Sequence, residues 1–409
     1  MMDTVRSGPD YQAFRDESLQ DPYPFLHRLG AADPVHWYEP MNLWLVTRYD
    51  DVLAGLRDSR LSSNRMRMYN QPLDAELQAR AKPLLDHLRH WLILLDAPDH
   101  GRIRRLIQKT FTPRMLQRLR PRIEKLAAEG LTNAMQDGKM DLLCDFAYQL
   151  PADVICEMLG IPAHQRDNYR EWSEGVMSFS TRGGPKLREY AEAANAALLN
   201  LKAMFSDLVD QRRRHPEEDL LSQLIASEDA GQKLSHDELM ALCVFLFIAG
   251  HDTTTNAITN GMVGFFEHPD QFKLLKSDVE GQAQGAVEEM LRYDNSVTRG
   301  VRQAKEDFTL RDKKISAGDT VVLSLLAANR DPEQYPDPDK FDIQREIKDN
   351  ISFGWGPHFC IGAPLARIEI EIALREIVRQ VPNIRPDYTR LQRRPTMGVR
   401  ALTKLPVTF

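Results

Sequence analysis

Cysteine is scarce in this sequence, and its few copies lie far apart. The 409 residues contain Cys144, Cys156, Cys243 and Cys360, and no two of them form a C-x-x-C pair. Structural zinc sites and iron–sulfur clusters are built on closely spaced cysteines. The spacing therefore suggests neither kind of site, and each cysteine has to be judged by its own surroundings.

A long apolar segment near the start and an excess of basic charge are also missing. Residues 1–20 are polar and acidic, without a stretch suited to a signal peptide or a membrane span. We therefore expect a cytoplasmic protein without a membrane partner. The net charge of -6 argues against nucleic acid as a general partner, because phosphate binding needs a concentrated basic surface.

The composition is that of a folded protein, with 42% hydrophobic and 27% charged residues. Length alone would suggest two or three domains, but no linker rich in Pro, Gly or Ser divides the chain. We expect one mainly helical domain over residues 1–409 with small β-sheets. Short strands are predicted at 34–38, 43–48, 308–310 and 320–326, the last two forming a hairpin-like element around 314–319. Helices are predicted at 121–135, 187–213 and 280–293, and a loop at 331–339.

The segment 353–362 surrounds one cysteine with three glycines and a proline. A helix is predicted to begin at Ala363-Pro364, with apolar residues over most of its circumference, so that Cys360 precedes a buried helix start. Amide donors at a helix start favour a thiolate over a thiol, and glycines allow close approach of a flat ligand. Cys360 is thus a candidate ligand for iron. A buried structural cysteine and a nucleophile paired with His358 are the alternatives, although a spacing of two residues suits the latter poorly.

The motif F-G-x-G-x-H-x-C-x-G, continued by Ala363-Pro-Leu-Ala-Arg367, resembles the cysteine signature of the bacterial cytochrome P450 family. The resemblance implies that Cys360 ligates the iron of haem b and that His358 hydrogen-bonds a haem propionate. It also implies the fold of that family, with the haem between a long central helix and the cysteine loop. The remaining loop residues implied to contact the haem are Phe353, Gly354 and Gly362.

A second motif interrupts a long apolar helix, which is predicted to begin at the capping box Ser235-His-Asp-Glu238 and to run to about Phe266. The run 249–255, Ala-Gly-His-Asp-Thr-Thr-Thr, conflicts with helix propensity and burial. The simpler interpretation is that the threonines bond back to carbonyls one turn earlier while Asp252 faces solvent. The run also resembles the family's oxygen-binding groove, which implies that Ala249 contacts the haem and that Asp252 and Thr253 relay protons. His251 is interpreted as structural or as a minor part of the solvent network.

Charged residues elsewhere match further elements of the family. Glu289 and Arg292 are three residues apart on a predicted helix, which by itself is a common surface feature. Followed by 329–332, they resemble the E-x-x-R helix and the loop that binds it, with Arg345 as the candidate third member because Lys340 stands where many relatives carry arginine. His100 and Arg104 resemble the H-x-x-x-R element that binds a propionate, an exposed basic helix being the alternative. Arg302 resembles a further propionate arginine.

The resemblance implies a monooxygenase that inserts one atom of O2 into a substrate. No flavin or iron–sulfur signature is present, so the electrons of NAD(P)H are expected to arrive through a separate ferredoxin reductase and ferredoxin. An acidic ferredoxin would suit the basic stretch 102–125. A peroxide-driven haem enzyme and a non-catalytic helical binding protein are the alternatives.

The substrate is indicated only as a class. By resemblance the pocket draws on segments 61–94 and 177–185 and is mostly apolar, which favours a medium or large apolar molecule from secondary metabolism. Arg65 and Arg67 could hold an anionic or carrier-linked substrate, with solvated arginines as the simpler interpretation. The run 295–297 lacks a proline that relatives often carry there. The individual residues predicted to line the pocket are Phe245, Val297, Thr298, Met397 and Val399.

Overall fold

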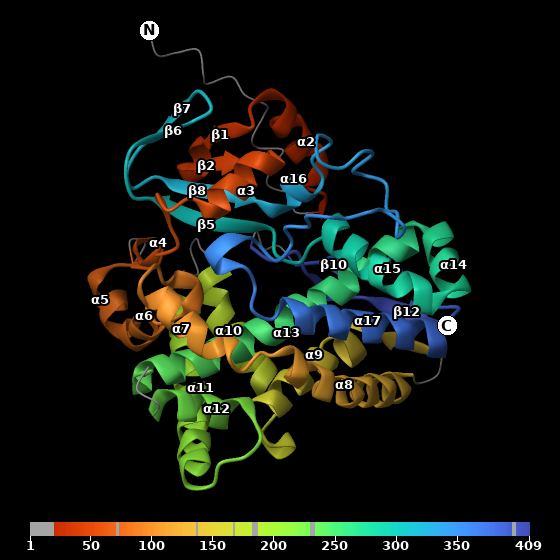
Figure 1. The fold of residues 1–409 in the computed structure, drawn as a ribbon, viewed down its shortest axis with the longest axis horizontal. Helices are drawn as coiled ribbons and strands as arrows, with labels where there is room; N and C mark the ends of the chain where they lie inside the picture. Colours follow the sequence, from red (N-terminus) through yellow and green to blue (C-terminus); the bar gives the residue numbers. More distant parts are fainter. Residues whose placement is uncertain are drawn as a thin grey trace. The chain divides into compact units, whose positions relative to one another are not determined.

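Helices make up most of the chain, with short strands between them, as the sequence predicts (Figure 1). The computed structural model describes residues 20–409 apart from 71–72, 136–137, 167, 182–186, 230–233 and 395–397. Its contacts group into two compact units. The first unit comprises residues up to 62, 259–360 and 385–406, and the second comprises 63–258, 361–384 and 407–409.

A five-stranded sheet organises the first unit, in the order β1-β2-β8-β5-β3. Strand β2 pairs in parallel with β8, and β8 pairs antiparallel with β5. One face buries β-branched and aliphatic side chains such as Val46, Val321 and Leu323 under helix α3. The strands are β1 (Val35–Tyr38), β2 (Leu43–Val46), β3 (Leu61–Ser62), β5 (Arg299–Ala304) and β8 (Thr320–Ser324), and α3 spans Tyr49–Arg57.

The sequence predicted that the strand at 308–310 pairs with the strand at 320–326, and this pairing is wrong. Strand β6 (Phe308–Leu310) pairs with β7 (Lys313–Ile315), whose residues were expected to lie at the start of the turn. Strand β8 instead pairs with strands of the five-stranded sheet, and α16 (Leu325–Asn329) begins where the strand was expected to continue. Ser324 ends the strand because its hydroxyl accepts a hydrogen bond from Ala327 N and caps α16.

Three more helices and several short elements complete the first unit. Helix α15 (Val279–Tyr293) agrees with the prediction to within one residue. It begins after Asp278, whose side chain caps it by accepting a hydrogen bond from Gly281 N at 3.0 Å. The residues 331–339 form turns, as expected. The other elements are α2 (Tyr23–Ala32), η1 (Glu39–Met41), α14 (Pro269–Ser277), η5 (Gly356–His358), β9 (Arg385–Pro386), β10 (Gln392–Arg393) and β11 (Leu402–Lys404).

Helices dominate the second unit, where α10 packs along α11 and α8 packs along α17 (Figure 1). Helix α8 begins eight residues before the predicted start, because Thr112 caps it and Pro113 occupies the first turn, while Pro121 lies inside it. The elements are α4 (Met66–Asn70), α5 (Ala75–Arg80), α6 (Lys82–Leu88), η2 (Leu92–Leu94), α7 (Asp99–Gln108), α8 (Pro113–Ala134), β4 (Lys139–Asp141), η3 (Leu142–Ala147), α9 (Gln149–Met158), η4 (Ala163–Gln165), α10 (Tyr169–Thr181), α11 (Leu187–Arg214), α12 (Leu220–Asp229), α17 (Ala363–Gln380) and β12 (Pro406–Thr408).

The longest described helix is α13 (His236–Glu267), whose extent confirms the prediction. Its capping box forms as expected: Ser235 N donates to Glu238 at 2.8 Å, and Glu238 N donates to the Ser235 hydroxyl at 3.2 Å. By length and composition α13 could cross a membrane, but 72% of its most apolar window is buried inside the protein. It is therefore a core helix.

Candidate active site

The cysteine loop is shaped by two glycines in the left-handed region. Gly354 and Gly356 have φ angles of +69° and +71°, which side chains with a Cβ rarely adopt. A Cβ on Gly356 would also lie 3.1 Å from the backbone oxygen of Leu56. The loop closes where Cys360 N donates to Phe353 O at 3.0 Å. The glycines are thus required for the path of the backbone itself.

Cys360 differs from the other three cysteines in its exposure. Cys156 and Cys243 are buried and Cys144 is half-buried, whereas Cys360 is exposed at the end of the loop. Burial raises the pKa of the Cys156 thiol to about 12, which keeps it protonated near neutral pH. Among the four, Cys360 is therefore the cysteine most open to a ligand.

The donor set around Cys360 fits a haem better than a bare metal ion. Within the described residues, no group of three or more His, Cys, Asp or Glu side chains could hold a metal ion. An iron bound to Cys360 would therefore need its other ligands from a non-protein group, as a porphyrin provides. The chain's one exposed thiol on a glycine-shaped loop matches that requirement.

The central part of α13 carries the predicted acid and alcohol. The Thr253 hydroxyl donates to Ala249 O at 3.1 Å, and the Asn256 side chain donates to Asp252 O at 2.6 Å. The first bond is the one that the simpler interpretation expects. It also commits the hydroxyl proton of Thr253 to a carbonyl, so the Thr253 oxygen remains able to accept a hydrogen bond. Asp252 is half-buried rather than fully solvated.

The glycine of this run has a packing role that the sequence did not indicate. A Cβ on Gly250 would lie 2.9 Å from Cγ1 of Ile155, which belongs to α9. Helices α9 and α13 therefore approach each other closely at this residue. Gly250 allows this packing without having to contact a ligand.

His251 is a structural residue, in agreement with its interpretation from the sequence. It is buried, with Nδ1 2.8 Å from Phe247 O and Nε2 3.1 Å from the Ser173 hydroxyl of α10. Because a carbonyl oxygen only accepts, Nδ1 carries the proton and Nε2 accepts from Ser173. Burial lowers the pKa of His251, so the neutral imidazole joins α10 to α13.

Sequence reasoning missed Glu369, a buried carboxyl on α17. It is 1% exposed, its Oε2 has no hydrogen-bond partner among the described residues, and Thr254 hydrogen-bonds to the side chain. Burial raises the pKa of Glu369 to about 8, although the Thr254 hydrogen bond acts in the opposite direction. A signal was available in the sequence, because Glu369 lies between Ile368 and Ile370 on a helix predicted to be mostly buried.

We expect the Glu369→Gln variant to lose part of the pH dependence of stability. The pKa of Glu369 is higher in the folded state than the usual 4.5, so the folded protein holds this proton while the unfolded chain releases it. Its contribution is therefore lost as pH rises from about 5 to 8. In urea unfolding, the free energy of unfolding of the variant should rise by about a few kcal/mol relative to that of wild type over that pH range. Glu129→Gln, an exposed carboxylate on α8, is the control; equal pH profiles for all three proteins would contradict the prediction.

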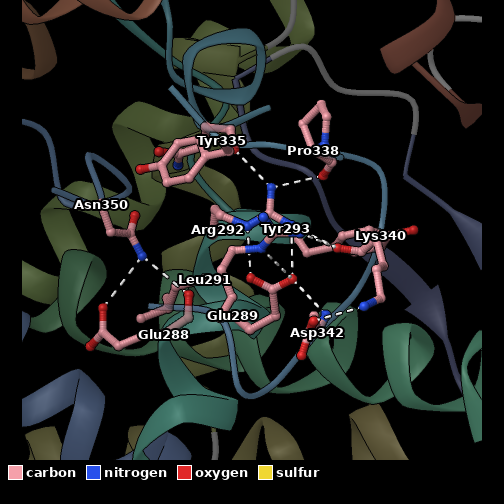
Figure 2. A network of polar contacts seen from close by, with 12 residues as sticks. Glu288, Glu289, Leu291, Arg292, Tyr293, Tyr335, Pro338, Lys340, Asp342 and Asn350 are labelled. Carbon is pink, nitrogen blue, oxygen red and sulfur yellow. Dashed lines mark hydrogen bonds and ion pairs between the residues drawn. The ribbon is translucent and has the colours of Figure 1, made fainter. Parts of the chain in front are cut away.

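The residues Glu289 and Arg292 form a fully buried ion pair (Figure 2). Both side chains are 0% exposed. Nε and Nη2 of Arg292 donate to the two Glu289 oxygens at 2.7 and 2.8 Å, and Nη1 donates to Asn329 O and Pro338 O at 3.0 and 2.8 Å. Helix α15 is thereby joined to the loop of residues 329–342. This burial distinguishes the pair from the surface pair that spacing alone would allow.

Arg345, the predicted third member, lies beside the same pair. Its Nε is 3.6 Å from Oε1 of Glu289, and its Nη2 donates to Lys340 O at 3.1 Å. Lys340 contributes its carbonyl, which also accepts from Arg292 at 3.2 Å, while its ammonium pairs with Asp342 at 2.9 Å (Figure 2). Lys340 stands where many relatives carry arginine, and its side chain pairs with Asp342 instead. The second guanidinium beside Glu289 therefore comes from Arg345.

The four predicted propionate ligands are divided between the two units. His100 and Arg104 lie on α7 in the second unit, where His100 is buried and Arg104 half-buried. Arg302 and His358 lie in the first unit, where Arg302 is buried and donates to Val301 O at 3.0 Å. Their common role in binding propionates stays a prediction.

The predicted pocket residues form two local groups. Val297 and Val399 pair as an isolated β-bridge, and Thr298 donates through both N and Oγ1 to Gly398 O at 3.2 Å. In the second unit, Phe245 packs against Trp91 with ring centroids 5.5 Å apart. Met397 lies outside the described residues, and Arg65 donates to Ser63 O and Ile93 O at 3.3 and 3.4 Å.

Comparison with known proteins identifies relatives over nearly the whole chain. The family model described as cytochrome P450 matches residues 73–381. The chain is 38% identical to the vitamin D(3) 25-hydroxylase of Pseudonocardia autotrophica, covering 99% of this chain and 98% of that protein. It is 37% identical to the cytochrome P450 monooxygenase PikC of Streptomyces venezuelae, covering 99% and 96%. The crystal structure of P450BioI with a fatty-acid-ligated acyl carrier protein matches with a TM-score of 0.87 at 33% identity, covering 96% and 99%.

Proposed function

Because this chain belongs to the cytochrome P450 family, a family of haem-thiolate monooxygenases, we propose that it oxidises a medium or large apolar small molecule of secondary metabolism with Cys360 as the axial ligand. Haem, when bound there, supplies the activation of O2, one atom of which enters the substrate while the other leaves as water. The observation that carries the proposal is the exposed Cys360 thiol on its glycine-shaped loop. Both units act together as one catalytic domain in the cytoplasm.

Asp252 and Thr253 are proposed to move protons during this reaction. Thr253 already donates its proton to Ala249 O, so its oxygen would act as a hydrogen-bond acceptor when haem is bound. The half-buried Asp252 carboxylate exchanges protons with solvent and passes them towards Thr253. Ala249 provides a small side chain at the haem face. His100, Arg104, Arg302 and His358 bind the propionates.

The proposal is tested by the absorption spectrum of the dithionite-reduced protein before and after addition of carbon monoxide. A Soret band shifted far to the red shows haem with a thiolate ligand. A protein without haem contradicts the monooxygenase proposal and leaves the helical binding protein. Turnover with peroxide, compared with turnover on NADPH, ferredoxin and reductase, separates the peroxide-driven alternative from the proposed one.

The electrons are proposed to come from a ferredoxin that docks on α7. Arg105 and Lys109 are exposed, and among the described residues neither forms an ion pair. Arg102 on the same helix is already paired with Glu238. Arg114 and Arg118, at the start of α8, are exposed as well. These cations would attract an acidic partner over a distance of about 10 Å at 0.1 M salt.

We expect the double variant Arg105→Glu/Lys109→Glu to slow reduction by an acidic ferredoxin by about tenfold or more at low salt, because steering is reversed. The measurement is the rate of haem reduction followed by stopped-flow absorption. Reduction by dithionite should be unchanged and serves as the control. An unchanged rate with ferredoxin would remove this docking site.

A further inference from the structure

The side chain of Asn295 connects two segments that belong to different parts of the candidate site. It lies two residues after the end of α15, is 2% exposed, and belongs to the run 295–297, which lacks a proline that relatives often carry. Its side-chain nitrogen donates to Val297 O at 2.7 Å and to Ser352 O at 3.1 Å. A side-chain amide carries two donor hydrogens, so Asn295 makes both bonds at once.

The first bond helps to fix the segment 296–298, part of which is expected to line the substrate pocket. The three successive backbone oxygens of this segment each accept a hydrogen bond, from Arg400 N at 2.7 Å, from Asn295 and from Leu325 N at 3.0 Å. A backbone that is held in this way also restricts the rotamers of its side chains. Of the three bonds, the one from Asn295 is the only one that comes from a side chain.

The second bond reaches the start of the cysteine loop. Ser352 directly precedes Phe353, whose oxygen accepts the loop-closing hydrogen bond from Cys360 N. The Ser352 carbonyl and Phe353 N belong to one planar peptide unit, which is rigid. The bond from Asn295 therefore orients the peptide at which the loop begins, and only Phe353 lies between that peptide and the bond to Cys360.

The residue Ser352 is also anchored in a way that does not depend on Asn295. Its hydroxyl donates to Leu291 O at 2.7 Å and accepts from the Asn329 side chain at 2.8 Å. Loss of the Asn295 amide would therefore leave the loop attached to α15. The Ser352 carbonyl would lose a donor in a buried place, which is unfavourable. The expected result is a less rigid cysteine loop in a folded protein.

These contacts give the Asn295 amide a role in the reaction. We infer that Asn295 is a positioning residue that couples the segment 296–298 to the loop of Cys360, so that a change in this segment alters how firmly the thiolate is held at the iron. The inference deepens the proposed function and rests on it, because it assumes a haem bound by Cys360 and a substrate pocket that includes Val297 and Thr298.

The test follows the far-red Soret band of the reduced carbon monoxide complex in urea, at concentrations where circular dichroism shows each protein to be folded. Conversion of this band to the shorter-wavelength band reports loss of the thiolate ligand. We expect Asn295→Ala to convert about tenfold faster than wild type. Asn260→Ala is the matched control, because Asn260 is also buried and donates to a carbonyl, Arg400 O at 2.9 Å. It should convert at the rate of wild type, since Arg400 stays paired with Asp294.

A further variant tests the coupling itself. Thr298→Ala removes the bond from the Thr298 hydroxyl to Gly398 O and should accelerate the conversion about threefold while Asn295 is present. In the Asn295→Ala background the same change should have no further effect, because the route to the loop is already broken. Asn295→Ser keeps one donor and should convert at an intermediate rate; it takes the place of Asn295→Ala if that variant does not fold.

Equal acceleration by Asn295→Ala and Asn260→Ala would show that Asn295 has only a structural role. An unchanged rate in Asn295→Ala, or independent effects of the changes at 295 and 298, would also overturn the inference. In each of these outcomes the wild type still shows the far-red band, so the proposed function stands. A wild type that lacks this band contradicts the proposed function instead.

Discussion

The Cys360→Ala variant is expected to lose the far-red Soret band of the reduced carbon monoxide complex entirely. Cys360 is the one exposed cysteine of the four, and its loop holds two glycines in the left-handed region. Alanine keeps that backbone and removes only the sulfur. Because thiolate ligation promotes cleavage of the O–O bond, turnover should fall by at least about 10³-fold, or about 4 kcal/mol of activation free energy.

The matched control for this experiment is Cys144→Ala. Cys144 is half-buried, and burial raises its pKa, so it is a poor candidate for an iron ligand. That variant should keep the band and most of the turnover. A far-red band that persists in Cys360→Ala would show that another residue holds the iron.

Replacing Arg292 by methionine should destabilise the protein by about 3–5 kcal/mol, because the buried Glu289 would lose both hydrogen bonds from Arg292 and keep only Arg345, 3.6 Å away, as a charged neighbour. The lost guanidinium also makes hydrogen bonds to the carbonyls of Asn329, Pro338 and Lys340. We therefore expect the loop of residues 329–342 to separate from α15 before global unfolding. Urea unfolding followed by circular dichroism gives the free energy.

Two further variants keep this prediction testable if Arg292→Met does not fold. Glu289→Gln/Arg292→Met removes both charges and should recover part of the stability. Arg379→Met breaks a Glu–Arg pair of the same three-residue spacing on α17, whose arginine is 63% exposed, and should cost about 1 kcal/mol or less. Equal losses for Arg292→Met and Arg379→Met would contradict the buried-pair interpretation.

Local signals allowed much of the helical structure to be predicted. The capping box at Ser235 and Glu238 located the start of α13, and apolar spacing located α11 and α15. The start of α8 was missed even though Thr112 and Pro113 are a typical helix start. The pairing of β2 with β8 had no such signal, because it joins segments about 280 residues apart through tertiary packing.

The sequence allowed the residues of the candidate site to be named, but not the exposure or burial of their side chains. The motif predicted Cys360 as the ligand of the iron, and the structure adds that this residue is exposed. Spacing placed Glu289 and Arg292 on one face of a helix, but their complete burial depends on a loop that begins some forty residues later. Glu369 was missed although it lies between two isoleucines on a helix predicted to be mostly buried, because a glutamate on a helix is usually solvated.

The contact between Arg102 and Glu238 limits how the protein could be engineered for a new electron donor. Glu238 takes part in the capping box of α13 and at the same time holds Arg102 of α7. Exchanging the basic face of α7 as a block would therefore disturb the helix that carries Asp252. At the ferredoxin site proposed above, a redesign that changes only Arg105 and Lys109 avoids this coupling and leaves the capping box of α13 in place.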